Sequence, residues 1–211
     1  MSDIIEIDNI ITKSYQEAIH SQIIDKSFPW YFNPTMVADG ILTKDVEYNL
    51  AGYHHFLYEE SKPVSPFFQF LYPLVLQIQD HSDIPMKHSI ERMRLNMSLP
   101  YKDSEHQHHL PHIDSHYEHW NGIYYVNDSD GDTYIFEETN DDYDMDDLKF
   151  IQNHKFTVKH TVTPKQGKLV LFNGKHYHSS SFCQNAKYRA VININFSHIK
   201  NYVNIGNNAV L

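Results

Sequence analysis

The chain has 211 residues, a formal net charge of -10, fifteen Tyr, twelve Phe and a single Cys. This length fits one domain with a sizeable core, and the aromatic content is typical of a packed globular protein. The excess of acidic residues disfavours a broad nucleic-acid surface, because affinity for nucleic acid comes largely from Lys and Arg. The single Cys excludes an internal disulfide framework and a Cys-rich zinc site.

The N-terminal segment and the apolar runs give no sign of export or of a membrane anchor. Residues 1–18 carry acidic residues early and lack a basic segment followed by an apolar core, so they do not have the pattern of a secretory signal. No apolar run approaches the ~20 residues needed to cross a bilayer. We therefore expect a cytoplasmic protein with no membrane partner.

Two segments in the first part of the chain have the apolar spacing of helices. In residues 12–27, Tyr15, Ile19 and Ile23 lie four residues apart, which predicts one buried helix face. In residues 65–80 the apolar residues recur every three or four positions, at Phe68, Leu71, Val75 and Ile78, which predicts a second helix.

Local residues mark the ends of these segments. Ser65 is the expected N-cap of the second helix and Pro66 its first residue, because a proline in the first turn loses no helical hydrogen bond. Pro73 lies inside the segment and predicts a kink or a break. Pro34 and Gly40 mark turns after the first helix.

After about residue 90 the pattern changes to short runs bounded by turn residues, which predict strands. The clearest runs have one apolar face and one polar face. The predicted strands lie within residues 91–100, 122–128, 133–138, 155–164, 168–173 and 188–196. Many short strands preceded by helices predict an antiparallel sheet system with the helices covering one outer face.

The last predicted strand sets the direction of an arginine. In residues 188–196 the apolar residues alternate with Arg189, Asn193 and Asn195. If the apolar face packs outward against the helices, Arg189 points into the interior, where an unpaired charge is costly. An inward arginine therefore needs an anion. Alternation alone equally permits a solvated face on which Arg189 lies beside a surface carboxylate.

Residues 137–147 contain seven carboxylates, and such a run usually forms a solvated loop. A divalent-cation site or a basic partner is the alternative, although the run lacks the glycine and the regular oxygen spacing of an EF-hand loop.

The sequence also has no Walker-type loop, no dinucleotide-binding glycine motif and no nucleophile elbow. Nucleotide binding and serine hydrolysis are therefore disfavoured.

Six histidines lie within residues 106–119, and His112 alone among them is followed two residues later by an aspartate. Residues two apart in a strand point the same way, so His112 and Asp114 can reach one ion. The pair is a weak signal by itself. The order of the downstream segments strengthens the interpretation of this pair as metal ligands. A turn enters a strand, a second strand leads to further histidines, and Arg189 follows.

This order of residues suits a particular chemistry. Two imidazoles and one carboxylate on one side of a metal leave three adjacent positions open, as a ferrous ion needs to hold a bidentate organic acid and dioxygen together. An arginine at the far end of the pocket can then pair with a second carboxylate of that acid, which explains an inward Arg189.

The sequence resembles the iron(II)- and 2-oxoglutarate-dependent oxygenase superfamily. The resemblance is to small hydroxylases of the prolyl-hydroxylase type in particular, and to related enzymes often encoded by bacteriophages. The resemblance covers roughly residues 90–197 and rests on "PHID", "IYYVNDSDGDTYIF", "PKQGKLVLFNGKHYH" and "RAVININF". One departure is the turn "SDGDT", where many relatives have Gly-Gly-Glu-Thr.

The resemblance implies a mainly β fold, a double-stranded β-helix or jelly roll, with N-terminal helices packed on its outer face. It implies one oxygenase domain over residues 1–211, with a helical part at about 1–88 and the jelly-roll core at about 89–198. Such enzymes use Fe(II), 2-oxoglutarate as co-substrate, dioxygen, and ascorbate as a supporting reductant. They decarboxylate 2-oxoglutarate to succinate and hydroxylate a C–H bond of a second substrate.

The resemblance also assigns site residues. The implied iron ligands, which are also the implied catalytic residues, are His112, Asp114 and His178. Arg189 would form a salt bridge with the distal carboxylate of 2-oxoglutarate. Asn96 and one of two adjacent tyrosines, Tyr124 or Tyr125, are candidates to hydrogen-bond the co-substrate, and we select Tyr124.

The second imidazole has two candidates, His176 and His178. Alternation cannot separate them, since residues two apart in a strand face the same way. The resembling enzymes place this histidine six residues after the strand residue that corresponds to Phe172, which selects His178. The residues expected at the loop or pocket rim, where one could orient a ligand or contact substrate, are His106, His108, His109, His116 and His119.

Two other interpretations are weighed against the oxygenase. A non-redox jelly-roll protein that binds zinc or another divalent ion is the main alternative, but it has no need of an inward Arg189. A cupin-type isomerase would present further His and Glu ligands that this sequence lacks. The substrates compatible with the oxygenase are a prolyl or other protein side chain, a free amino acid and a nucleobase, and no pattern indicates an oligomeric state.

Overall fold

The structure is a computed structural model that describes residues 2–34, 51–85, 87–101, 108–115, 117–141, 151 and 153–197. Its helices are α1 (Lys13–Ile24) and α2 (Phe67–His81). Its strands are β1 (Ile4–Ile7), β2 (Tyr31–Asn33), β3 (Gly52–Glu59), β4 (Lys62–Pro63), β5 (Ile90–Ser98), β6 (His119–Tyr125), β7 (Thr133–Thr139), β8 (Val158–Val162), β9 (Leu169–Asn173), β10 (His176–Ser180) and β11 (Arg189–Ser197).

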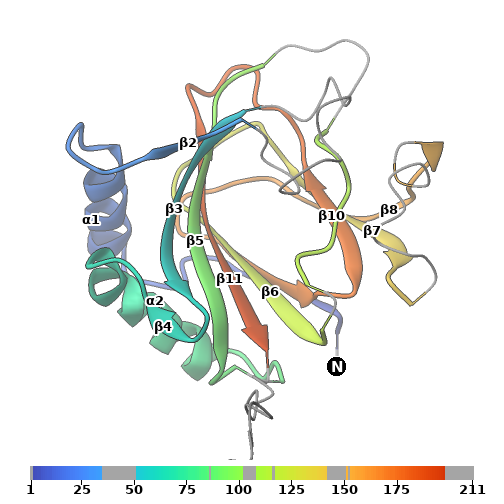
Figure 1. The fold of residues 1–211 in the computed structure, drawn as a ribbon, viewed down its shortest axis with the longest axis horizontal. Coiled ribbons are helices and arrows are strands. Elements are labelled where there is room, and N and C mark those ends of the chain that lie inside the picture. The colour runs from blue at the N-terminus through green and yellow to red at the C-terminus, as the bar shows by residue number, and fades with distance from the viewer. Residues whose placement is uncertain are drawn as a thin grey trace, which may run out of the picture.

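The strands form a large and a small antiparallel sheet. The large sheet has the order β1-β9-β6-β11-β5-β3-β2, with β4 paired to β3, and the small sheet has the order β10-β7-β8. The two sheets lie on opposite sides of a shared interior (Figure 1). This arrangement is a jelly roll with helices on its outer face, as the sequence predicted.

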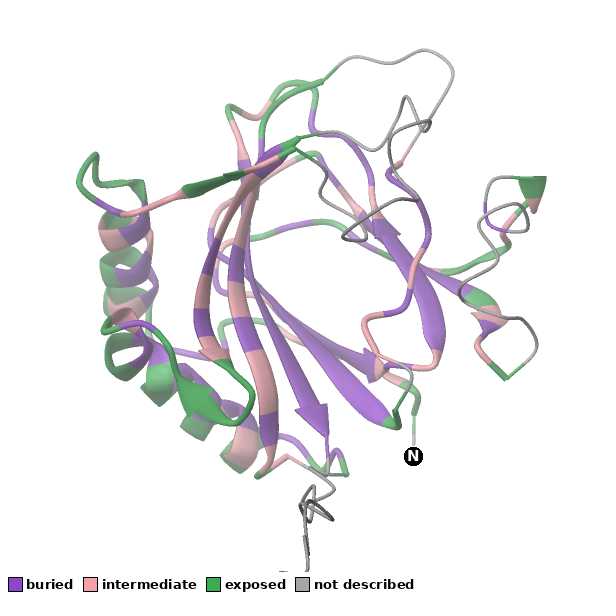
Figure 2. Cartoon of the chain, viewed as in Figure 1, coloured by how far each residue is buried: buried purple, intermediate pink, exposed green. Residues whose placement is uncertain are grey.

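Both helices cover the outer face of the large sheet (Figure 1). Ile19 and Ile23 of α1 and Leu71 and Ile78 of α2 are almost fully buried, and they belong to the same core cluster as residues of β5, β6, β9 and β11. Figure 2 shows the consequence, since each helix alternates buried and exposed residues while β6 and β11 are buried along their whole length. The apolar spacing therefore predicted both helices correctly.

The start and the middle of α2 test two local predictions. The helix begins at Phe67 with Pro66 as its N-cap, one residue later than predicted, and the hydroxyl of Ser65 accepts a hydrogen bond from the backbone N–H of Phe67 at 3.2 Å. Of the kink or break predicted at Pro73, the break does not occur, because the helix continues through this residue. A proline removes one helical hydrogen bond, but here burial of the apolar face on the sheet outweighs that loss. Neither described helix is both long and apolar enough to cross a membrane.

The first part of the chain contains more β structure than the sequence predicted. Strands β1 to β4 all lie before residue 88, in the part of the chain that was predicted to be mainly helical. Residues 52–59 read "GYHHFLYE", in which aromatic residues and histidines occur on both faces, so no alternation marks the strand. The strand forms because it pairs with β5 over most of its length. The turn predicted at Gly40 lies outside the described residues.

Strand β11 is central to the site because it pairs with β5 on one side and β6 on the other. Its residues Ala190, Ile192 and Ile194 join the core beneath the helices, whereas the alternate residues face the interior between the sheets. The predicted alternation is thus correct. Across β5, β11 and β6 the interior face forms the rows Arg92–Asn195–Asn121, Arg94–Asn193–Ile123 and Asn96–Val191–Tyr125, followed by the pair Ser98–Arg189.

Candidate metal centre and adjoining cavity

The structure brings His112, Asp114 and His178 together. The backbones of His112 and His178 pair as an isolated antiparallel bridge, with N–H to O=C distances of 3.0 and 2.9 Å in the two directions. This pairing sets the two imidazole rings 4.4 Å apart between centroids. One atom from each imidazole and one from the carboxylate of Asp114 lie within 4.8 Å of one another, so the three residues could hold a metal ion.

The imidazole nitrogens of this group are oriented for coordination. Nε2 of His112 lies 4.0 Å from Oδ1 of Asp114, and Nε2 of His178 lies 3.9 Å from Oδ2. Nδ1 of His112 donates to the backbone carbonyl of Leu110 at 3.1 Å, which leaves the lone pair on Nε2. Two nitrogen donors and one carboxylate form the donor set that non-haem Fe(II) sites use, so the residues fit a ferrous ion.

The carboxylate of Asp114 is held from two sides. Arg92 approaches Oδ1 at 3.0 Å, and the side-chain amides of Asn193 and Asn195 donate to Oδ2 at 3.2 and 2.9 Å. Nε of Arg92 also donates to the amide oxygen of Asn195 at 2.9 Å, which links the two supports. These partners come from β5 and β11, so the large sheet fixes the orientation of the carboxylate.

The protonation states also suit metal binding. Burial raises the pKa of Asp114, but the charge of Arg92 and the nearby imidazoles outweigh this effect and hold the pKa well below its usual value. Burial lowers the pKa of His178 to about 3, and it lowers the pKa of His112 as well. Both imidazoles are therefore neutral and the carboxylate is ionised at neutral pH, which are the forms that bind metals.

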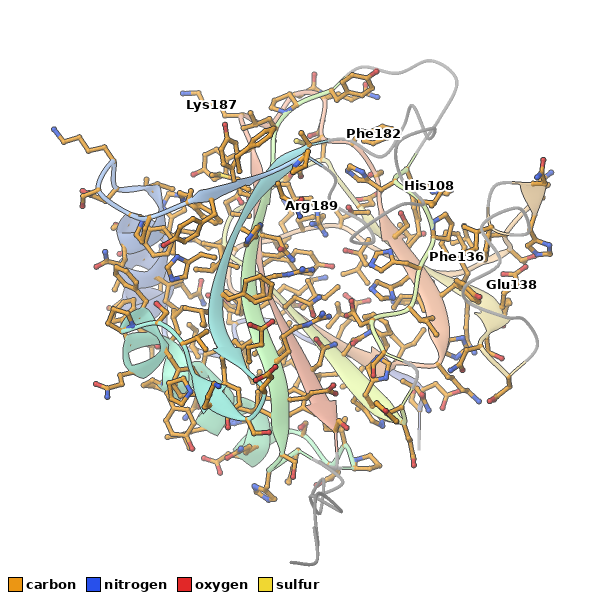
Figure 3. All side chains as sticks on the ribbon, viewed as in Figure 1. His108, Phe136, Glu138, Phe182, Lys187 and Arg189 are labelled. Carbon is orange, nitrogen blue, oxygen red and sulfur yellow. The ribbon has the colours of Figure 1, made fainter. Side chains whose placement is uncertain are left out.

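One cavity is lined both by His112 and His178 and by Arg189. Figure 3 shows Arg189 in the interior, between the large sheet and β10. Nε of Arg189 donates to the carbonyl of Gly131 at 2.8 Å, and Nη2 donates to the hydroxyl of Thr133 at 2.8 Å. Both acceptors are neutral, so the buried charge of Arg189 remains available to an anion in the cavity.

Thr133 is a site residue that was not predicted from the sequence. Its hydroxyl oxygen accepts hydrogen bonds from Arg189 and from the Tyr125 hydroxyl, the latter at 2.7 Å. With both of these donors in place, the hydroxyl proton of Thr133 can be directed into the cavity that the residue lines. The only sequence signal is its position at the start of the strand after the "SDGD" turn.

The "SDGD" turn, where the sequence departs from many relatives, supports Arg189. A Cβ on Gly131 would lie 2.9 Å from Cδ of Arg189, so only glycine allows this close approach. The carboxylate of Asp130 accepts hydrogen bonds from the backbone N–H groups of Gln184, Asn185 and Ala186. It therefore organises the loop that leads into β11.

The two co-substrate candidates fall on different faces of the sheet. Asn96 lines the cavity, but Tyr124 belongs to the fully buried core beneath the helices, and we correct its assignment. Tyr125 is the tyrosine on the cavity face, because it lies in the same row as Asn96 and its hydroxyl reaches Thr133. Two adjacent tyrosines in one strand give no sequence signal that tells the faces apart.

The other clustered histidines have separate surroundings. His109 lines the cavity, whereas the ring of His108 packs against Tyr134 and Phe136. Nδ1 of His119 donates to the carbonyl of Tyr117 at 2.7 Å. The residues of the cluster that lie outside the described part of the chain are His106 and His116.

His176 lies apart from the metal group. Its Nε2 is 3.8 Å from the carboxylate of Asp3 and 3.4 Å from Nζ of Lys159. A register shift between His176 and His178 in the pairing of β10 with β7 separates two residues that regular alternation treats as equivalent.

In the acidic run, the carboxylate of Glu138 accepts a hydrogen bond from the backbone N–H of Thr157 at 3.0 Å, and residues 142–150 lie outside the described part of the chain.

Comparison with known proteins supports the class of enzyme that the sequence resembles. Residues 98–195 match the family described as putative 2OG-Fe(II) oxygenase, and this segment contains the whole His-Asp-His group and Arg189. No curated protein sequence matches the chain. Together with the structural neighbours below, the match confirms the resemblance to the iron(II)- and 2-oxoglutarate-dependent oxygenase superfamily and supports an oxidoreductase of this class.

Solved structures of this superfamily share the fold. An oxidoreductase of the 2OG-Fe(II) oxygenase family from Burkholderia pseudomallei is 12% identical, with a TM-score of 0.61 and coverage of 92% of this chain and 85% of that one. A Trichoplax adhaerens prolyl hydroxylase, in complex with a peptide of hypoxia-inducible factor, is 13% identical, with a TM-score of 0.55 and coverage of 92% and 83%. HygX from Streptomyces hygroscopicus, with nickel and 2-oxoglutarate bound, is 10% identical, with a TM-score of 0.55 and coverage of 92% and 82%.

Proposed function

We propose that the chain is an Fe(II)- and 2-oxoglutarate-dependent dioxygenase that hydroxylates a second substrate, with His112, Asp114 and His178 as the iron ligands. The observation that carries this proposal is a cavity that His112 and His178 of the candidate metal group share with the buried Arg189. The hydrogen-bond acceptors of Arg189 within the described part of the chain are both neutral. A bare metal site does not need such an arginine. An enzyme that binds an ion and a dicarboxylic acid side by side does.

Different residues serve the metal ion and the distal carboxylate of the co-substrate. Arg92 and two asparagines keep the Asp114 carboxylate in place before a metal arrives. At the other end, Arg189 and the hydroxyl of Thr133 would bind the distal carboxylate of 2-oxoglutarate, and Asn96 lies on the wall between the two ends. A ferrous ion in this site would supply the redox chemistry with dioxygen that decarboxylates 2-oxoglutarate to succinate and hydroxylates a C–H bond.

A prolyl or other protein side chain is the substrate that we favour. The support is the likeness to the prolyl hydroxylase bound to a peptide. The bound 2-oxoglutarate of HygX likewise supports the co-substrate. We further propose that residues 1–211 act as one oxygenase domain, because α1, α2 and the large sheet share a hydrophobic core.

The test is the formation of succinate. Purified protein with Fe(II), 2-oxoglutarate, ascorbate and dioxygen should produce succinate slowly, and faster when a cell lysate supplies the substrate. Without dioxygen, Fe(II) and 2-oxoglutarate together should give a visible charge-transfer band. The His178→Ala variant, which lacks one proposed ligand, is the matched control for both measurements.

The alternative is a non-redox protein that binds zinc or another divalent ion. It predicts neither the charge-transfer band nor succinate above the level of the His178→Ala control, with iron shown to be bound. That result would overturn the dioxygenase. If succinate forms, untargeted mass spectrometry of the lysate for products that gain one oxygen atom identifies the class of substrate.

A further inference from the structure

His109 is a cavity residue that the proposed function does not yet use. Only 3% of the residue is exposed, and it lines the same cavity as His112, His178 and Arg189. From the sequence, His109 was expected at the loop or pocket rim, together with four other histidines. The structure instead makes it part of the wall beside which a bound co-substrate would lie.

The position of His109 is fixed by its surroundings. Its backbone N–H donates to the carbonyl of Ser180 at 2.9 Å, and its carbonyl accepts from the Ser179 hydroxyl and from Nδ1 of His108. Its ring packs edge-on against Phe182, with centroids 4.7 Å apart and planes at 73°. Figure 3 shows Phe182 and His108 on the β10 side of the interior, across from the large sheet. A side chain held in this way loses little freedom when it binds a ligand.

One edge of the ring is available to a ligand. Nδ1 of His109 is enclosed and has no hydrogen-bond partner within the described part of the chain. Because the ring nevertheless lines the cavity, the opposite edge, which carries Nε2, is the one that can reach it. Burial, and next the charge of Arg189, lower the pKa of His109 to about 3, so the ring is neutral and can offer one N–H without a second positive charge.

The anion end has room for another donor. Arg189 already uses two of its five N–H groups on Gly131 and Thr133. A carboxylate can accept about four hydrogen bonds, which is more than one arginine usually supplies. Arg189 and His109 line the same cavity beside the end of β10, since His109 pairs with Ser180 while Gly131 lies against both Arg189 and the carbonyl of Ser181. The two side chains can therefore reach one bound anion.

We propose that His109 donates a hydrogen bond from Nε2 to the distal carboxylate of 2-oxoglutarate and is a specificity-determining residue for this co-substrate. The proposal rests on the proposed function, because it requires that 2-oxoglutarate occupies the cavity. His109 and Arg189 together would then distinguish a 2-oxo acid with a distal carboxylate from one without it.

The test compares two acids on three variants of the full chain. His109→Phe keeps the ring and its packing on Phe182 but removes the donor, whereas His109→Gln retains an N–H donor. His160→Phe is the matched control, since that side chain pairs with Glu6 outside the cavity. For each Fe(II)-loaded protein, the Kd of 2-oxoglutarate and of 2-oxobutanoate is measured without dioxygen. The second acid has the same metal-binding end and lacks the distal carboxylate. Mn(II) affinity without either acid reports whether the metal site is intact.

We expect His109→Phe to raise the Kd of 2-oxoglutarate by about 10–100-fold, the usual scale for losing one hydrogen bond to a charged group. The Kd of 2-oxobutanoate and the affinity for Mn(II) should not change. The Kd of 2-oxoglutarate for His109→Gln should lie between those of His109→Phe and the wild type, and the Kd for His160→Phe should match that of the wild type. An unchanged Kd of 2-oxoglutarate in His109→Phe, or an equal weakening of both acids, would overturn the role of His109. A wild-type chain that binds iron but not 2-oxoglutarate would instead overturn the proposed function itself.

Discussion

The metal end and the anion end of the cavity share strand β11 but are supported in opposite ways. At the metal end, both carboxylate oxygens of Asp114 already have partners, with Arg92 on one and Asn193 and Asn195 on the other. At the anion end, Arg189 uses only part of its donor capacity on neutral acceptors of the chain. One end is filled with internal contacts, and the other keeps donors for a ligand.

The difference arises from what each end has to bind. A metal site needs its ligands already in position, because a carboxylate that can swing away costs affinity, and the supporting hydrogen bonds provide this order. A site for a diffusing anion needs donors that water can satisfy before binding and that the anion can take over. Substitutions at the two ends should therefore have separable effects.

The largest expected effect is the loss of the second imidazole. His178→Ala should abolish tight binding of Fe(II) or Mn(II), because only Asp114 and His112 would remain of the proposed ligands. His176→Ala is the control and should keep the metal, since its Nε2 lies beside Asp3 and Lys159. Titration with Mn(II) followed by electron paramagnetic resonance measures both variants. A His176→Ala protein without metal beside a His178→Ala protein with metal would reverse the assignment.

At the anion end, Arg189→Ala should weaken 2-oxoglutarate and leave the metal in place. Removing one partner of a buried charge pair costs about 2–5 kcal/mol, which corresponds to a rise in Kd of roughly thirty- to several-thousand-fold. The measurement is a titration of the Fe(II)-loaded variant with 2-oxoglutarate in the absence of dioxygen. An unchanged titration would contradict the role of Arg189, and a loss of Mn(II) affinity would show that the two ends are not separable.

At the metal end, Arg92→Met should lower the affinity for Mn(II) by about 10–100-fold, the usual range for losing a residue that orients a metal ligand. The sign of the change is informative. Removing a positive charge beside a metal site would by itself strengthen metal binding, so tighter binding would mean that charge outweighs orientation. Arg92→Lys keeps the charge but lacks the planar guanidinium group. Its affinity for Mn(II) should lie between those of Arg92→Met and the wild type.

The smallest expected effect concerns stability and pH in the metal-free protein. The pKa of His109 is about 3 in the folded chain, whereas an exposed histidine titrates near 6.5, so the unfolded chain binds a proton first as the pH falls. The contribution of His109 to stability is therefore complete above pH ~6.5 and is lost as the pH decreases toward ~3. Between pH 7 and 5 the loss is about 2 kcal/mol. Urea unfolding should show a shallower pH dependence for His109→Phe than for the wild type, and equal slopes would contradict the expectation.

The features that were predicted well from the sequence are those that depend on the residue pattern within a single strand or helix. The alternation in β11 placed Arg189 on the face opposite the isoleucines, and the spacing of apolar residues predicted α1 and α2. Alternation failed where both faces carry similar residues, as with Tyr124 and Tyr125 in β6 and with the aromatic strand β3. Hydrophobic pattern has no information in those places, and only pairing with neighbouring strands sets the faces.

The contacts that complete the site join residues far apart in the chain. The pairing of Arg92 with Asp114 and the hydrogen bond from Arg189 to Thr133 depend on the order and register of the strands, which no local pattern contains. The same holds for the shift in β10 that separates His176 from His178. The resemblance selected His178 from its spacing to Phe172, whereas strand periodicity left the choice open.

The register of β11 has a consequence for how such a chain can change over evolution. Inserting or deleting one residue within the strand would turn its side chains to the opposite faces, which would send Arg189 or the asparagines toward the helices and isoleucines into the cavity. A shift of two residues would restore the faces but move each side chain along by roughly 7 Å relative to β5 and β6. Length changes in β11 would therefore damage both ends of the cavity at once, and diversification among its descendants is expected in the connecting loops.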